Sequence, residues 1–78
     1  MPEFTKLQGQ YLAFLDAYTK VNGHPPAEAD FQRYFKVTPP AVHQMILTLA
    51  RLGLITRSPG QARSIRLNVR SEEIPRLE

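Results

Sequence analysis

Residues 38–53, TPPAVHQMILTLARLG, decide the fold, because they carry the signals for both ends of one helix. The hydroxyl of Thr38 can accept a hydrogen bond from an unpaired N–H of the first helical turn, as helix N-caps do. Pro39 and Pro40 follow in that first turn, where no intrahelical donor is lost. Gly53 suits the left-handed residue that closes a helix. We therefore expect a helix over residues 38–52.

This helix has two chemically different faces. Apolar side chains recur at spacings of four, three and three residues, which places them in one stripe: Val42, Ile46, Leu49 and Leu52. Another face carries small, polar or basic side chains and no acid: Ala41, Gln44, Thr48 and Arg51. Two interpretations are open for this segment, a helix that lies in a DNA groove or an ordinary amphipathic helix with a solvated outer face.

Length and composition exclude several classes of protein. The chain has 78 residues and no cysteine, which rules out disulfides and thiolate zinc sites and is compatible with a reducing cytoplasm. His24 and His43 are the two histidines, so we expect no metal site. The start of the chain lacks the features of a signal peptide, and no apolar run approaches the roughly 20 residues needed to span a bilayer. We expect a cytoplasmic protein with no membrane partner.

The formal net charge of +3 is unevenly distributed along the sequence. Residues 31–71 contain no acid and seven cations, of which six are arginine. Arginine is the side chain best suited to phosphate and base-edge recognition, and a basic stretch of this kind is typical of a surface that faces a polyanion. The seven cations are Arg33, Lys36, Arg51, Arg57, Arg63, Arg66 and Arg70.

Two further helices are predicted before residue 38. Thr5 and Gln8 have the spacing of a capping box, and an apolar stripe runs from there to the stop signal at residues 22–23. The stripe consists of Leu7, Tyr11, Leu15, Tyr18 and Val21, widened by Leu12 and Phe14. An extended connector, His24-Pro25-Pro26, precedes a short helix over residues 27–35. Only a very short turn then separates this helix from Thr38, which is the helix-turn-helix arrangement.

A β-hairpin is predicted after Gly53. Residues 54–57 are β-prone, residues 58–61 form a turn, and residues 63–70 alternate between apolar and polar side chains. We therefore predict a mainly α (α+β) fold, a three-helix winged helix-turn-helix with a C-terminal hairpin wing. The domain should span residues 1–70, and residues 71–78 should form a flexible tail. The arginines of the hairpin could instead protect a lone sheet edge from aggregation.

In its order of motifs the chain resembles the N-terminal DNA-binding domain of the LexA repressor family. The resemblance covers nearly the whole chain, and five short motifs carry it: Asn22-Gly23-His24-Pro25-Pro26; Thr38-Pro39 with Ala41; Leu49-Ala50-Arg51 with Gly53 and Ile55; Arg63-Ser64-Ile65-Arg66-Leu67; and Glu72-Glu73-Ile74-Pro75. The resemblance implies a winged helix-turn-helix that binds double-stranded DNA.

The sequence also departs from the family pattern. It stops where the family's self-cleaving domain would begin, so no catalytic serine–lysine pair can be carried over and we expect no enzymatic activity. Lys36 stands where the family has glycine, which implies mild strain if that site needs a positive φ. Pro40 stands where the family has a base-reading asparagine, and His43 and Gln44 stand where it often has acids. The family's operator is therefore not assumed for this chain.

We expect a sequence-specific, repressor-like regulator of transcription, with helix 38–52 in the major groove and the wing on the phosphate backbone. The base-reading candidates are Thr38, Pro40, Ala41, His43, Gln44 and Thr48. The phosphate-binding candidates are Arg33, Lys36, Arg51, Arg57, Arg63 and Arg66. We expect no cofactor or small-molecule substrate, and tight binding should need a homodimer or a partner protein.

The main alternative is a winged-helix interaction module whose basic face binds an acidic protein. A gel shift with mixed DNA at low salt separates this alternative from DNA binding. RNA binding is less favoured, because no exposed aromatic platform is evident. An enzyme is the least favoured class, because no serine has a nearby base and no acid is paired with a histidine in a recognisable way.

Overall fold

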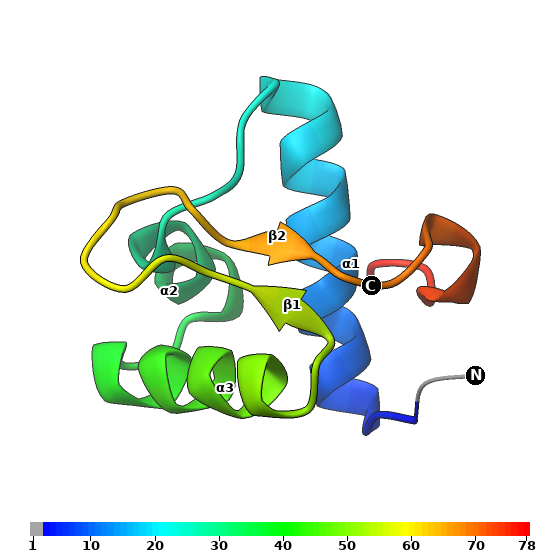
Figure 1. Cartoon of the computed structure of the whole chain (residues 1–78), viewed down its shortest axis with the longest axis horizontal. Coiled ribbons are helices and arrows are strands. Elements are labelled where there is room, and N and C mark those ends of the chain that lie inside the picture. The colour runs from blue at the N-terminus through cyan, green and yellow to red at the C-terminus, as the bar shows by residue number, and fades with distance from the viewer. Residues whose placement is uncertain (1–2) are drawn as a thin grey trace.

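The computed structural model describes residues 3–78, so Met1 and Pro2, which fall in the predicted domain, lie outside the described residues. Within that range the chain forms three α-helices, a two-stranded antiparallel sheet and a short 3-10 helix (Figure 1). This order confirms the predicted winged helix-turn-helix of the α+β class. The elements are α1 (Lys6–Asn22), α2 (Glu28–Phe35), α3 (Pro39–Arg51), β1 (Ile55–Thr56), β2 (Arg66–Leu67) and η1 (Ser71–Glu73).

Helix α1 begins and ends at the predicted signals. The backbone N–H of Thr5 donates to the Gln8 side chain at 2.9 Å, and the N–H of Gln8 donates to the Thr5 hydroxyl at 3.1 Å. Gly23 closes the helix with a φ of 78°. The predicted stripe is wrong at its two ends, since Leu7 is 52% exposed and Val21 is 84% exposed. The last turns of α1 extend past the other elements, so nothing covers Val21 there (Figure 1).

A tight turn joins α2 to α3. Lys36 ends α2 in the left-handed region, with φ 56° and ψ 50°. This is the conformation expected at a position where the family has glycine. Thr38 then caps α3, and its hydroxyl accepts from the N–H of Ala41 at 3.4 Å. None of the helices in the described part of the chain is long and apolar enough to cross a membrane.

Helix α3 ends in a Schellman motif. The N–H of Leu54 donates to the Leu49 carbonyl and the N–H of Gly53 donates to the Ala50 carbonyl, both at 3.0 Å. Leu52 lies outside the helix at this cap and is exposed, so its predicted place in the buried stripe is wrong. Leu54, on the far side of the reversal at Gly53, is buried in its stead.

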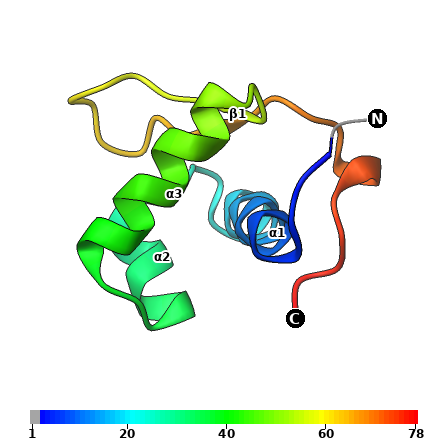
Figure 2. The same cartoon turned by 90° about the horizontal axis from the view of Figure 1, so that it is seen from below.

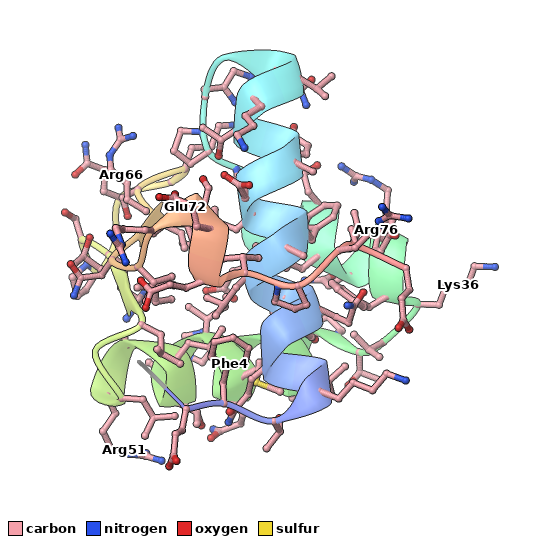
Figure 3. All side chains as sticks on the ribbon, turned by 90° about the vertical axis from the view of Figure 1, so that its right-hand side faces the viewer. Phe4, Lys36, Arg51, Arg66, Glu72 and Arg76 are labelled. Atoms are coloured by element: carbon pink, nitrogen blue, oxygen red, sulfur yellow. The ribbon has the colours of Figure 1, made fainter. Side chains whose placement is uncertain are left out.

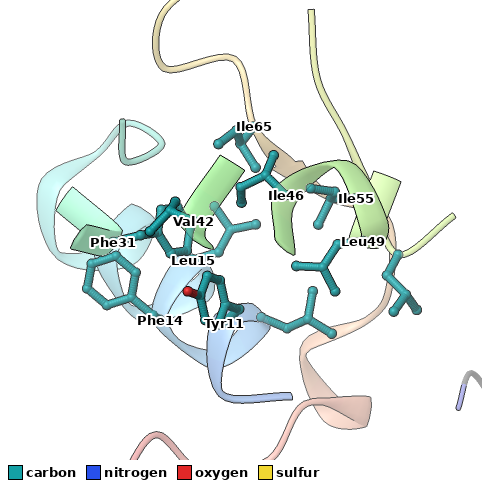
Figure 4. Close-up of a cluster of buried hydrophobic side chains, with 11 residues drawn as sticks. Tyr11, Phe14, Leu15, Phe31, Val42, Ile46, Leu49, Ile55 and Ile65 are labelled. Atoms are coloured by element: carbon teal, nitrogen blue, oxygen red, sulfur yellow. The ribbon is translucent and has the colours of Figure 1, made fainter. Parts of the chain in front are cut away.

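One apolar core joins all three helices to the inner face of the hairpin (Figure 4). On the α1–α2 side it is aromatic, with ring centroids 5.4 Å apart for Tyr11 and Phe31 and 4.9 Å apart for Phe14 and Phe31. Beneath α3 it is aliphatic. The buried members are Tyr11, Leu12, Phe14, Leu15, Phe31, Val42, Ile46, Leu49, Leu54, Ile55 and Ile65. This core holds α3 by its inner stripe and leaves the opposite face of α3 to solvent.

The hairpin has shorter strands than the alternating pattern predicted. Only Ile55↔Leu67 and Thr56↔Arg66 pair, in antiparallel register. The predicted alternation of faces is nevertheless present across residues 64–70, with Ile65 buried and Arg66 exposed. Beyond this ladder, the returning limb has a positive φ of 56° at Arg63.

The tail, residues 71–78, was predicted to be flexible, and in the structure it lies against α1. After η1 the chain crosses α1, where the Gln10 amide donates to the Arg76 carbonyl at 2.9 Å and accepts from the Glu78 N–H at 2.8 Å (Figure 3). At Gly9 a Cβ would lie 2.9 Å from both the Phe4 ring and the Pro75 ring, so glycine is what allows this close approach. Tertiary contacts from α1 therefore order a segment whose own sequence has no periodic signal.

Candidate nucleic-acid interface

The outer face of α3 is a continuous, accessible surface. Thr38, Pro40, Ala41, His43 and Gln44 are exposed, and Thr48 is half-buried. Figure 2 shows α3 along the edge of the molecule, with α1 and α2 on its inner side. The structure thus brings all six predicted base-reading residues to one helix and its cap, turned away from the core.

Ala41, Gln44 and Thr48 form the central row of this face. Their spacing of three and four residues places them one above the other on the helix. None of the residues in α3 is acidic. Short, uncharged side chains in such a row allow a helix to approach base edges closely without repelling phosphates.

His43 lies at the margin of this face and is tied to α2. Its Nδ1 is 3.2 Å from each carboxylate oxygen of Glu28, a geometry that places a proton on Nδ1. One nitrogen of the His43 imidazole therefore already has a hydrogen-bond partner within the protein. Sequence reasoning missed Glu28 as a neighbour of α3, because the two residues are 15 positions apart.

Lys36 and Arg51 flank α3 at its two ends. Lys36 lies in the turn before the helix, and Arg51 is its last residue. Figure 3 shows both side chains pointing away from the body of the molecule. Both are exposed, so α3 has an accessible cation at each end.

The wing is the loop of residues 57–65 between β1 and β2. Its base is closed by two hydrogen bonds, in which the Ser58 N–H donates to the Ser64 hydroxyl at 2.9 Å and that hydroxyl donates to the Ser58 carbonyl at 3.1 Å. The wing loop and the N-terminal end of α3 reach the same side of the molecule (Figures 1 and 2). A hollow of about 260 Å³ lies where the wing faces the start of α2, and Arg57 and Glu28 are among its lining residues.

Arg66 and Arg33 present cations in different settings. Arg66 is exposed on the outer face of β2 and projects from the molecule (Figure 3). Arg33 forms an ion pair with Asp30 while its own side chain stays 72% exposed. An exposed arginine that is already paired retains donors on its outer edge, since the guanidinium carries five N–H groups.

Arg63, a predicted phosphate ligand, is engaged with other parts of the fold. Its Nη1 turns inward and donates to the Tyr18 hydroxyl and the Pro25 carbonyl, both at 3.2 Å, and to the Asp30 carboxylate at 3.3 Å. These contacts give Arg63 a role within the fold, while its side chain remains 42% exposed. The backbone of Arg63 is left-handed, with a φ of 56°.

Asp30 is a buried acid that the sequence analysis did not single out as functional. It is 7% exposed and accepts from the Ala27 N–H at 2.8 Å as well as from Arg33 and Arg63. Burial alone would raise the pKa of Asp30, but the Ala27 N–H and the guanidinium groups of Arg63 and Arg33 outweigh it and lower that pKa. The three-residue spacing from Ala27 is a capping-box signal, whereas nothing local connects Asp30 to Arg63.

A family model and the curated proteins that are similar to this chain carry the same family name. A family model described as the LexA DNA binding domain matches residues 1–64. The LexA repressor of Thermosipho africanus is 39% identical over 74 residues, covering 95% of this chain and 37% of that protein. The LexA repressor of Petrotoga mobilis is 35% identical over 75 residues, covering 95% of this chain and 36% of that protein. The chain thus spans little more than a third of the length of these curated relatives.

Proposed function

The chain belongs to the LexA DNA-binding domain family, and from that premise we propose that it binds double-stranded DNA sequence-specifically and acts in transcriptional repression. The observation that carries the proposal is the outer face of α3, which is accessible, free of acids and flanked by the exposed cations Lys36 and Arg51. Such a helix suits the major groove, which admits one α-helix.

Base recognition is assigned to the central row of α3. The exposed amide of Gln44 can form a bidentate pair with adenine at N6 and N7, and the methyl of Ala41 can contact a thymine methyl one turn away. Thr38 and Thr48 lie at the two ends of the row, with Pro40 beside it and His43 at its margin. These roles predict that each residue affects particular positions of the operator.

We assign phosphate contact to four cations, of which three are exposed and Arg57 is half-buried at the start of the wing: Lys36, Arg51, Arg57 and Arg66. Arg33 is a fifth candidate through the outer edge of its paired guanidinium. Four contacts should give a log–log salt dependence with a slope of about −3 to −4. A slope close to zero would contradict the electrostatic part of the proposal.

Selection from a random duplex library at two salt concentrations tests the proposal directly. We expect enrichment of a defined motif and weaker binding at the higher salt concentration. Gln44→Ala should relax specificity at one base pair by roughly 1–3 kcal/mol. Gln32→Ala, a glutamine on α2, is the matched control and should leave the motif unchanged. A uniform loss across all sequences in Gln44→Ala would contradict the role assigned to Gln44.

One domain of this size offers one recognition helix, so we propose that a tight complex needs two copies or a partner protein on adjacent half-sites. A palindromic motif in the selection would support two copies, and its half-site spacing would give their geometry. A single short motif would favour a partner protein. We also propose that the protein acts at the nucleoid, in the cytoplasm. No DNA binding at low salt would instead favour the basic-face interaction module.

A further inference from the structure

One nitrogen of Arg63 connects the wing to three other parts of the fold. Its Nη1 donates to the Tyr18 hydroxyl on α1, to the Pro25 carbonyl in the connector and to the Asp30 carboxylate on α2, at 3.2–3.3 Å. Arg63 is the residue at which the returning limb of the wing adopts a positive φ. The contact therefore lies at the point where the wing leaves the body of the domain.

The Asp30 carboxylate, which accepts from Arg63, is also held by other donors. Asp30 is 7% exposed, and its carboxylate is held in place by the Ala27 N–H at 2.8 Å and by Arg33. A buried carboxylate with several donors is rigid and stays ionised, since each donor favours the charged form. Asp30 thus offers the wing a fixed, negatively charged anchor at the start of α2.

The residues that follow Arg63 connect its contact with Asp30 to the rest of the wing. Ser64, next to Arg63, closes the loop through its two hydrogen bonds with Ser58. Ile65 follows and is buried in the core. The returning limb is therefore held at three consecutive residues. The outgoing limb is tied to it through Ser58 and, below the wing, by the pairs Ile55↔Leu67 and Thr56↔Arg66. Arg57, the residue before Ser58, takes its position from this arrangement.

We infer that Arg63 is a positioning residue, which pins the wing to Asp30 and Tyr18 so that Arg57 meets the DNA backbone, and that it is not itself a phosphate ligand. This inference rests on the proposed function. It assigns a role in DNA binding to Asp30 and Tyr18, two residues that need not touch DNA.

Asp30→Asn separates the two roles of Arg63, because they give opposite expectations. If Arg63 binds phosphate, removing the acid frees its guanidinium and removes a repulsive charge, so binding should tighten. If Arg63 positions the wing, binding should weaken by about tenfold, the effect of losing one charge-assisted hydrogen bond. The salt slope should also become shallower by about one, because Arg57 loses its phosphate. The asparagine keeps an oxygen for the Ala27 N–H.

Matched control variants test whether the loss of a charge or of a tyrosine hydroxyl elsewhere in the protein has the same effect. Glu72→Gln removes the same charge from η1, which lies on the other side of α1 from the wing (Figures 1 and 2), and should leave affinity unchanged or slightly tighter. Tyr18→Phe removes one acceptor of Arg63 and should weaken binding about threefold, whereas Tyr34→Phe, whose hydroxyl donates to the Glu78 carbonyl at 2.6 Å, should leave affinity unchanged. If Asp30→Asn fails to fold, as judged by its thermal midpoint, Tyr18→Phe decides the question.

A readout without DNA keeps this inference distinct from the proposed function. Backbone relaxation of residues 57–63 in the free protein should show more motion in Asp30→Asn and Tyr18→Phe than in the parent chain. Absence of DNA binding by the parent chain would defeat the proposed function. Tighter binding by Asp30→Asn, or a wing equally mobile in all variants, would overturn the positioning role of Arg63.

Discussion

Gln10→Ala tests whether the tail is part of the folded domain. The Gln10 side chain is 9% exposed, and both ends of its amide bond to the tail backbone, to the Arg76 carbonyl at 2.9 Å and the Glu78 N–H at 2.8 Å. The alanine variant removes both hydrogen bonds and keeps the helix, since alanine is the best helix former. Any loss of stability therefore reports on the docking of residues 74–78.

The expected loss follows from these two bonds. Each contributes about 1 kcal/mol net, so Gln10→Ala should lower the free energy of unfolding by about 2 kcal/mol. The loss is limited to that order because a released tail returns its polar groups to water. For a domain of this size, 2 kcal/mol corresponds to a fall in Tm of roughly 8–16 °C.

Urea denaturation followed by circular dichroism measures the loss, and ¹⁵N relaxation of residues 74–78 measures the release of the tail. Gln32→Ala is the control, because Gln32 is also helical but lies on α2 and does not hold the tail. If Gln10→Ala changes stability no more than Gln32→Ala, and residues 74–78 are already mobile in the parent chain, the docked tail is refuted.

Three further predictions concern local features of the fold. Thr38→Ala should lower the free energy of unfolding by about 1 kcal/mol in urea denaturation, because α3 loses its N-cap; an unchanged midpoint would mean that the two prolines suffice. Lys36→Gly should raise that free energy by up to about 1 kcal/mol, since glycine adopts the left-handed conformation without strain; a lower Tm would indicate that the lysine side chain stabilises the turn. The lowered pKa of Asp30 contributes stability that is present above the ordinary aspartate pKa of 3.8 and is lost as pH falls through the lower folded value. Asp30→Asn should therefore lose less stability than the parent chain between neutral pH and that acidic range in thermal unfolding, and an equal loss would contradict the charged anchor.

The short-range features of this protein follow from its sequence because they arise within three or four residues. The capping box at Thr5 and Gln8 and the N-cap at Thr38 each depend on a side chain and a backbone group less than one turn away. The stop at Gly53 depends on the positive φ that glycine adopts without strain. The apolar periodicity of α3 likewise identified the buried Val42, Ile46 and Leu49 and hence the outward face. The exposure of Leu7 and Val21 did not follow, because periodicity gives the face of a helix but not how far its partners extend.

By itself, then, the sequence determined the three helices, the order that makes a winged helix-turn-helix, and the acid-free face of α3. Only the tertiary structure decided what Arg63 contacts and where the tail lies. Arg63 meets Asp30 across 33 residues, and Gln10 meets the tail across 66 and 68. Contacts over such separations form only once the core has brought the elements together, so no local pattern encodes them.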